Sequence, residues 1–389
     1  MLSELSKKDT NLISGSGGYS AFGKQALKTA QIINNPITFR ILTKLEIIYF
    51  DPVTNSTNQQ QQRSELKGRL TNTLSPEEFD VLSLDIFRYQ AEFLPIYKNF
   101  LDALNIAPHT INNPADIPFL PISFFKSQVI MSSSQTPELI FKSSGTSGQT
   151  RAEHHVADTA LYNWSLVEGF KMVYGDPNQY SFLALLPSYL ENGDSSLVHM
   201  VNALMELSGK HRSGFYLSNF DLLKDQIIQN RIDNIPTILI GVSFALLDFG
   251  EQFSLEKGPE VVMETGGMKG RRKEIIRSEL HKSLSETLGV PLIHSEYGMT
   301  ELLSQAYSKG NGRFNCPPWM RVEIRDVRDP RSWVKCGKTG GVNVIDLANI
   351  DSCAFIETSD LGRKYEDDSF EILGRFDSAD VRGCNLLFA

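Results

Sequence analysis

Residues 138–151 read Glu-Leu-Ile-Phe-Lys-Ser-Ser-Gly-Thr-Ser-Gly-Gln-Thr-Arg, an apolar run that ends in a loop of hydroxyl residues and glycines. The apolar part has the length of a buried strand, and an amphipathic helix is expected soon after it, over residues 157–174. The same alternation continues along the chain. Strands are expected at 181–186, 237–241, 260–264, 291–294, 341–347, 354–358 and 370–373, and helices at 195–208, 220–230 and 271–288. Short apolar strands that alternate with amphipathic helices indicate an α/β fold with a largely parallel sheet.

The composition excludes several classes of protein. The chain has 389 residues, of which 41% are hydrophobic and 22% charged, so it can form one large globular domain or two to three smaller ones. A net charge of −8 leaves no basic excess for a nucleic-acid backbone, so no nucleic-acid partner is expected. The longest apolar runs are strand-sized, so no integral membrane segment is expected. The first ten residues lack a signal peptide's apolar stretch, and the four cysteines show no metal-like spacing. Both features favour a cytoplasmic protein.

The organisation of the chain changes near residue 75. Residues 1–73 contain a glycine- and serine-rich stretch and a run of four glutamines, which predict a loosely attached, flexible N-terminal extension. Ser75-Pro-Glu-Glu predicts a helix start, with Ser75 as the N-cap and Glu78 completing a capping box. We therefore predict a catalytic domain over residues 74–374 and a short C-terminal tail over residues 375–389.

The loop after residue 142 has the chemistry of a phosphate site. Glycines let the backbone N–H groups approach a polyphosphate, hydroxyls donate further hydrogen bonds, and an arginine adds positive charge. The candidate residues are Ser143, Ser144, Gly145, Thr146, Ser147, Gly148 and Arg151. A competing phosphate motif at residues 18–24 matches the start of a Walker A loop, but Gln25 replaces the magnesium-binding hydroxyl and no strand precedes it, so we interpret it as a linker.

Further polar segments follow later strands. Gly266 and Gly267 offer bare backbone against which a flat base can lie, and Thr358-Ser-Asp-Leu-Gly carries a carboxylate, Asp360, suited to a ribose diol. Residues 295–301 read Ser-Glu-Tyr-Gly-Met-Thr-Glu and place an aromatic ring, a hydroxyl and a carboxylate close together. Loops at the carboxyl ends of parallel strands are where such sheets bind ligands.

These segments, in this order, resemble the adenylate-forming (acyl-activating) superfamily. Tyr297, Gly298, Met299, Thr300 and Glu301 match its Tyr-Gly-x-Thr-Glu signature, and residues 374–377 match its Gly-Arg-x-Asp hinge motif. The resemblance implies a fold of parallel sheets flanked by helices and the use of ATP and Mg²⁺. It also implies that Thr300 contacts the α-phosphate, Glu301 binds Mg²⁺, and Asp360 and Arg375 bind the ribose. The phosphate loop departs from the usual Pro-Lys ending, because Thr150-Arg151 stand there.

The C-terminal region indicates which family of the superfamily the chain resembles. Only twelve residues follow Asp377, which leaves no room for the mobile C-terminal domain that carries a lysine in most members. This outline resembles the LuxE-like acyl-protein synthetase family, supported by residues 86–91, 119–126 and 186–191. The family resemblance implies activation of a long-chain fatty acid, with Cys384 carrying the acyl group as a thioester. It also implies a protein acyl acceptor, such as an acyl reductase.

Two other functions remain open from the sequence. An acyl- or aryl-CoA ligase-like enzyme would pass the adenylate to coenzyme A. A non-catalytic nucleotide-binding subunit of a reductase complex would fit the missing lysine domain, although Glu301, Asp360 and Arg375 are present. The acyl chain length is not predicted.

Overall fold

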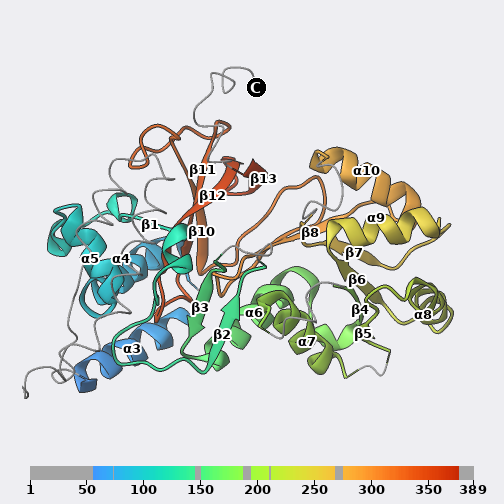
Figure 1. Cartoon of the computed structure of the whole chain (residues 1–389), viewed down its shortest axis with the longest axis horizontal. Coiled ribbons are helices and arrows are strands. Elements are labelled where there is room, and N and C mark those ends of the chain that lie inside the picture. Colours follow the sequence, from blue (N-terminus) through green and yellow to red (C-terminus); the bar gives the residue numbers. More distant parts are fainter. Residues whose placement is uncertain are drawn as a thin grey trace, which may run out of the picture.

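A six-stranded sheet organises one half of the protein, in the order β5-β4-β6-β7-β8-β9 (Figure 1). The structure is a computed structural model that describes residues 56–72, 74–144, 150–186, 194–209, 212–267 and 275–375. The strands of this sheet are β4 (Ser181–Leu185), β5 (Gly214–Phe215), β6 (Thr237–Gly241), β7 (Val261–Glu264), β8 (His294–Tyr297) and β9 (Ala306–Ser308). The first five strands in the sheet order are parallel, and β9 runs antiparallel to β8. Every residue of β4 and β6 is buried, as expected for central strands covered on both faces.

Helices alternate with these strands along the chain and cover the sheet. They are α6 (Thr159–Tyr174), α7 (Ser196–Ser208), α8 (Phe220–Ile232), α9 (Ser243–Gln252) and α10 (Arg277–Leu288). Figure 1 shows α9 and α10 above the sheet and α6 and α7 below it. The predicted α/β class, with a parallel sheet between helices, is confirmed. No helix within the described ranges is long and apolar enough to cross a membrane.

A second sheet of five strands occupies the other half, and it is mainly antiparallel. It contains β1 (Leu120–Pro121), β10 (Met320–Arg325), β11 (Thr339–Asp346), β12 (Phe355–Lys364) and β13 (Phe370–Arg375). Strand β12 pairs with β11 and β13 in antiparallel fashion and with the short β1 in parallel. A separate hairpin of β2 (Leu139–Lys142) and β3 (Glu153–Val156) lies between the two sheets in Figure 1. The sequence did not predict that this second sheet would be antiparallel.

The first helix of the described chain lies in the N-terminal segment that the sequence predicts to be loosely attached to the domain. Helix α3 (Ser56–Leu70) lies within the 1–73 segment, yet Leu66 and Leu70 are buried. Its Arg63 pairs with Asp351 at 2.6 Å and Asp158 at 3.1 Å, so this part of the segment is anchored to the domain. Residues 1–55 lie outside the described residues.

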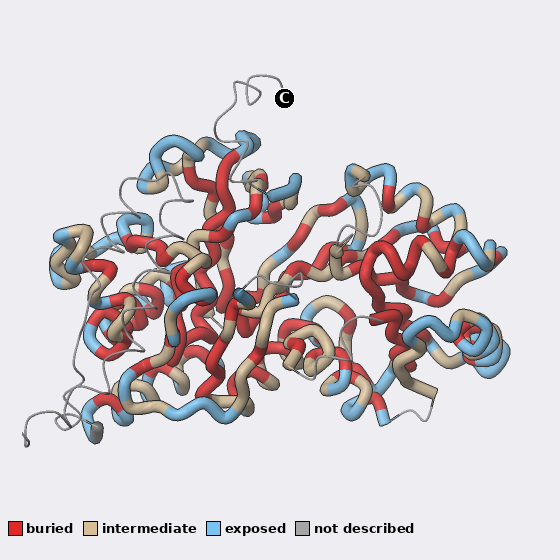
Figure 2. Tube along the Cα trace, in the orientation of Figure 1, coloured by how far each residue is buried: buried red, intermediate tan, exposed pale blue. Residues whose placement is uncertain are grey.

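The predicted helix start at Ser75 is confirmed. Helix α4 (Pro76–Phe93) has the full capping box between Ser75 and Glu78, and α5 (Pro95–Ala103) follows it. Figure 2 shows that buried backbone runs through the centre of both halves, while exposed residues gather on the outer helices. The core thus extends across both sheets.

Two strands differ from their predicted bounds in a way that matters for the site. Strand β8 begins at His294, three residues later than predicted, so the Ser-Glu-Tyr of the signature lies within the strand and not in a loop after it. Strand β12 continues to Lys364, so Asp360 also lies within a strand, directly opposite Arg375 of β13. In both cases a neighbouring strand supplies hydrogen bonds that the sequence pattern alone does not reveal.

Candidate active site

Three predicted site residues meet where the two sheets approach each other. Tyr297 of β8 donates its hydroxyl to Asp360 Oδ2 at 2.9 Å, and Arg375 donates its Nε to Asp360 Oδ1 at 3.0 Å. Burial and the nearby Asp360 carboxylate raise the pKa of Tyr297 well above its usual value, so the hydroxyl remains a donor. The charge of Asp360 likewise raises the pKa of Arg375, which stays cationic. The arrangement links the parallel sheet to the antiparallel one through a single carboxylate.

Buried side chains form hydrogen bonds with the backbone carbonyl groups of Thr300 and Glu301. His154 Nδ1 lies 2.7 Å from the Thr300 carbonyl oxygen, and because that oxygen only accepts, Nδ1 carries the proton. Burial lowers the pKa of His154 to about 4, so the ring is neutral. Asn349 donates its side-chain amide to the Glu301 carbonyl at 3.0 Å. The backbone of the turn is therefore fixed before any ligand arrives.

A buried aspartate secures the residues that follow the turn. Asp346, at the end of β11, accepts hydrogen bonds from the backbone N–H groups of Leu303 at 2.8 Å and Ser304 at 2.9 Å. The Ser304 hydroxyl donates to the other oxygen at 2.5 Å. Asp346 is fully buried, so these donors replace the water that it loses on folding. No pattern in the sequence indicates this role for His154, Asn349 or Asp346.

Glu301 is the carboxylate that the family resemblance assigns to Mg²⁺. Burial raises its pKa to about 7, against the opposing influence of its own backbone N–H and of the cations Arg375 and Lys126. Within the described residues no cluster of three or more His, Cys, Asp or Glu side chains could hold a metal ion by itself. A single carboxylate is nevertheless the usual protein ligand set for Mg²⁺, because phosphates and water complete the shell. The residues present fit such an ion, and its charge would favour the ionised form of Glu301.

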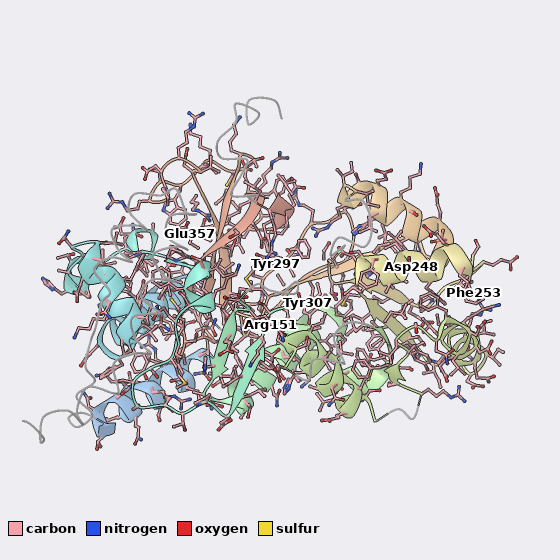
Figure 3. The ribbon with its side chains drawn as sticks, in the orientation of Figure 1. Arg151, Asp248, Phe253, Tyr297, Tyr307 and Glu357 are labelled. Carbon is pink, nitrogen blue, oxygen red and sulfur yellow. The ribbon has the colours of Figure 1, made fainter. Side chains whose placement is uncertain are left out.

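Arg151 forms hydrogen bonds with the backbone at the start of the predicted phosphate loop. Arg151 donates its Nε to the carbonyl of Ser143 and its Nη2 to that of Lys142 at 3.3 Å. The Ser143 hydroxyl accepts from the Ala152 N–H at 2.9 Å, and Ser144 is exposed. Gly145, Thr146, Ser147 and Gly148 lie outside the described residues, and so does Cys384. Figure 3 shows Arg151 and Tyr297 near the junction of the two halves.

The glycine turn after β7 is hydrogen-bonded to the buried carboxylate of Glu264. Gly266 and Gly267 both have positive φ, at 72° and 89°, a conformation that glycine adopts without strain. Glu264 Oε2 accepts the Gly266 N–H at 2.7 Å. Burial alone would raise the pKa of Glu264, but hydrogen bonds with His281 and Ser295 and the charge of Arg277 lower it to about 2. The turn is thus fixed by an ionised carboxylate.

The remaining signature residues, Gly298 and Met299, connect β8 to the Thr300–Glu301 turn. Gly298 is partly exposed, and Met299 packs against the core. A side chain at position 298 would collide with the Glu296 carboxylate, which explains why only glycine fits there. The described residues therefore bring together Tyr297, Asp360 and Arg375, with Glu301 within electrostatic reach of the last two.

Comparison with known proteins agrees with this fold. No protein-family model matches the chain, and no curated protein sequence matches it. Among solved structures, an open conformation of 2-hydroxyisobutyryl-CoA ligase in complex with 2-HIB-AMP and CoA is similar at a TM-score of 0.59 and 13% identity, covering 86% of this chain and 76% of that one. The same ligase in the postadenylation state, in complex with R3-HIB-AMP, gives a TM-score of 0.58 at 12% identity and covers 86% and 74%. At such identities the likeness shows the fold alone, and that fold is the one expected of an adenylate-forming enzyme.

Proposed function

We propose that the protein activates a carboxylic acid with ATP to form an acyl-adenylate. In this reaction a carboxylate oxygen attacks the α-phosphorus, a new P–O bond forms, and the bond to the β-phosphate breaks to release pyrophosphate. The observation that supports this most is the Tyr297–Asp360–Arg375 contact at the junction of the sheets, beside the Thr300–Glu301 turn. The adenylate-forming fold agrees with it.

The state of Asp360 suits a ribose. Each of its oxygens accepts one hydrogen bond, from Tyr297 and from Arg375 respectively, whereas a carboxylate can accept about four. Asp360 therefore keeps capacity for two ribose hydroxyls. The Arg375 side chain is 73% exposed, so its cation can also face an arriving phosphate or ribose oxygen.

We assign Thr300 to the α-phosphate and Glu301 to Mg²⁺. A bound magnesium ion would offset negative charge on the phosphates during transfer. The hydrogen bonds from His154 and Asn349 hold the Thr300 and Glu301 backbone in place, so little reorganisation is required when ATP binds. Gly266 and Gly267 are assigned to the flat face of the base, because no described atom lies within 4 Å of the position of a Cβ at Gly266. The phosphate loop from Ser143 to Arg151 would bind the β- and γ-phosphates.

We further propose the second step that the acyl-protein synthetase resemblance implies. The Cys384 thiolate would attack the acyl-AMP carbonyl, forming a C–S bond while AMP leaves. The acid would be a fatty acid, and the thioester would be discharged to a partner protein such as an acyl reductase in the cytoplasm.

Pyrophosphate release tests the first step, and intact mass tests the second. With ATP, Mg²⁺ and a fatty-acid mixture we expect pyrophosphate and a hydroxylamine-labile acyl mass on the protein. Cys384→Ser should still release pyrophosphate but gain no such mass. Formation of acyl-CoA by Cys384→Ser would favour the CoA-ligase-like alternative. ATP binding without pyrophosphate release from any acid would favour the non-catalytic subunit.

A further inference from the structure

Strands β8 and β9, with the residue directly before β9, place three polar side chains on one face of the parallel sheet, next to Gly298. Glu296 lies directly opposite Tyr307 in the antiparallel register, and Tyr297 lies opposite Ala306. Gln305 Cγ lies 3.4 Å from where a Cβ of residue 298 would stand, and Glu296 Oε1 lies closer still. Because alternate residues of a strand share a face, Glu296, Gln305 and Tyr307 form one group. We refer to these three residues as the β8–β9 polar cluster.

Two members of the cluster are buried without hydrogen-bond partners. Tyr307 is 2% exposed and Gln305 is 6% exposed. Within the described part of the chain, the Tyr307 hydroxyl and Gln305 Oε1 make no hydrogen bond. Folded proteins pair nearly all buried polar atoms, because an unpaired one loses its hydration without replacement. Two unpaired atoms from residues that share one face of the sheet are what a ligand supplying the missing partners would require.

The neighbouring helix does not supply those partners. Helix α6 packs its aromatic side chains against the cluster, with the Tyr174 ring 5.6 Å from Tyr307 and perpendicular to it. The Tyr174 hydroxyl is already bonded to His294 Nδ1 at 3.1 Å, and that of Tyr162 to the Ser196 carbonyl at 3.3 Å. The aromatic hydroxyls that surround the cluster are therefore occupied.

The cluster can reach the acyl group of an adenylate. Gly298 lies two residues before Thr300, so their backbones are separated by at most about 7 Å. An acyl carbon joined to a phosphate at Thr300 would thus lie within a few bonds of Gly298. Both Gly298 and Glu296 are partly exposed, so the cluster is not completely enclosed by the protein. Figure 3 shows Tyr307 close to Tyr297 at the junction of the two halves.

The donors and acceptors of the cluster match a hydroxyl group. A hydroxyl accepts one hydrogen bond and donates another, so it can accept from the Tyr307 O–H and donate to Gln305 Oε1. Burial and the nearby Glu264 raise the pKa of Glu296 to about 8, so at neutral pH its carboxyl group is protonated and can also donate. An unsubstituted alkyl chain would leave all of these atoms unpaired.

We propose that the carboxylic acid activated by this protein carries a hydroxyl group within a few carbons of its carboxylate, and that Tyr307, Gln305 and Glu296 bind that hydroxyl. This inference rests on the proposed adenylation and specifies its substrate. A hydroxylated fatty acid would fit both the proposed fatty-acid substrate and the hydroxyl-binding cluster.

The test compares matched pairs of acids. Straight-chain acids of four to ten carbons are each measured against derivatives hydroxylated at the second, third or fourth carbon, with pyrophosphate release as the readout. We expect one hydroxy acid to exceed its parent in kcat/KM by about tenfold or more, because a site that hydrogen-bonds a hydroxyl discriminates against the analogue that lacks it. In Tyr307→Phe this ratio should fall towards one.

The matched control is Tyr180→Phe, which also removes one hydroxyl from a tyrosine. That hydroxyl donates to the Tyr174 carbonyl at 2.9 Å and lies outside the cluster, so the hydroxy-to-parent ratio should be retained. Glu296→Gln, which keeps hydrogen-bonding capacity, should retain part of the ratio.

Three results would overturn the inference. The parent acids could be preferred throughout the panel, the ratio could survive Tyr307→Phe, or an amino-substituted acid could exceed every hydroxy acid. Pyrophosphate release from the parent acids without a gain from any hydroxyl refutes this inference and leaves adenylation standing. No release from any acid of the panel or from the long-chain fatty-acid mixture refutes the adenylation and the inference together.

Discussion

Replacing Glu296 with glutamine should stabilise the protein in a manner that depends on pH. Burial raises the pKa of Glu296 from 4.5 to about 8, and the ionised Glu264 on the neighbouring strand adds to the effect. The folded protein therefore keeps this proton between pH 4.5 and 8, where the unfolded chain has lost it. Stability falls as pH rises through that window and is constant above it. Glutamine cannot ionise, so the variant avoids this loss.

The size of the effect follows from the shift. At 1.36 kcal/mol per pKa unit, a rise from 4.5 to about 8 corresponds to on the order of 5 kcal/mol at pH 9. The titratable groups that interact electrostatically with Glu296 are Glu264 from β7, across the sheet, and Tyr307 from β9 and Tyr162 and Tyr174 from α6, on its own face. These groups are present in both the parent protein and Glu296→Gln, so their own titration largely cancels in the difference in unfolding free energy. We therefore expect Glu296→Gln to match the parent near pH 5 and to exceed its stability at pH 9 by about 3–5 kcal/mol.

Urea unfolding at pH 5, 7 and 9 measures this difference. Tryptophan fluorescence suits the assay, since Trp164 and Trp319 lie in contact within the fold, with ring centroids 4.5 Å apart. Glu286→Gln is the matched control, because Glu286 is exposed on α10, and its effect should stay within about 0.5 kcal/mol at every pH. Equal stability differences for Glu296→Gln at pH 5 and pH 9 would refute a carboxyl group that stays protonated in the folded protein at neutral pH.

Three further substitutions test other parts of the structure. Glu301→Gln should lower the rate of pyrophosphate release by about 100-fold or more, because it removes the proposed metal ligand. The thermal midpoint should not fall, because the pKa of the buried Glu301 is already raised. An unchanged rate would exclude Glu301 as the ligand. Asp360→Ala should raise the Kd for ATP by about 10- to 150-fold, the equivalent of about 1.5–3 kcal/mol for a charged hydrogen bond, measured by calorimetry; equal weakening of the acid would indicate misfolding. Arg63→Met should cost about 3 kcal/mol in urea unfolding, since it leaves Asp351 without its partner at 2.6 Å; a loss under 1 kcal/mol would mean that α3 contributes little to stability.

Local sequence signals predicted those elements whose stability is itself local. The capping box at Ser75 and Glu78 forms within one turn, so the start of α4 could be predicted from four residues. Strands β4 and β6 are buried on both faces, and their continuous apolar runs reflect that burial. These features need no knowledge of distant segments.

Helix α3 could not be predicted in the same way. Its first half is a glutamine-rich polar stretch, and its Arg63 is anchored to Asp351, which lies 288 residues further along the chain. Ion pairs between segments so far apart leave no periodic pattern in the sequence. The same limit applies behind the Thr300–Glu301 turn, where His154 and Asn349 come from separate strands and loops. The signature motif indicated the turn but not the residues that hold it.

The assignment of β8 shows how a small shift in bounds hides a functional residue. When the signature is interpreted as a loop after the strand, Glu296 becomes an ordinary polar loop residue. Once β8 runs from His294 to Tyr297, alternation places Glu296 on the face opposite Ser295. Ser295 lies beside Glu264, so the two glutamates point to opposite faces of the sheet.

This separation determines their charge states. Glu264 takes the nearby cation Arg277 and hydrogen-bonding partners His281 and the Gly266 N–H, and its pKa falls to about 2. Glu296 faces aromatic side chains of α6 and receives none of these partners, so its pKa rises. One face of the sheet therefore presents a fixed anion that supports the glycine turn proposed to bind the base. The other presents a neutral carboxylic acid that can donate a hydrogen bond to the acyl group. Because alternate residues of β8 point to opposite faces, this one strand contributes to both the nucleotide side and the acyl side of the proposed reaction.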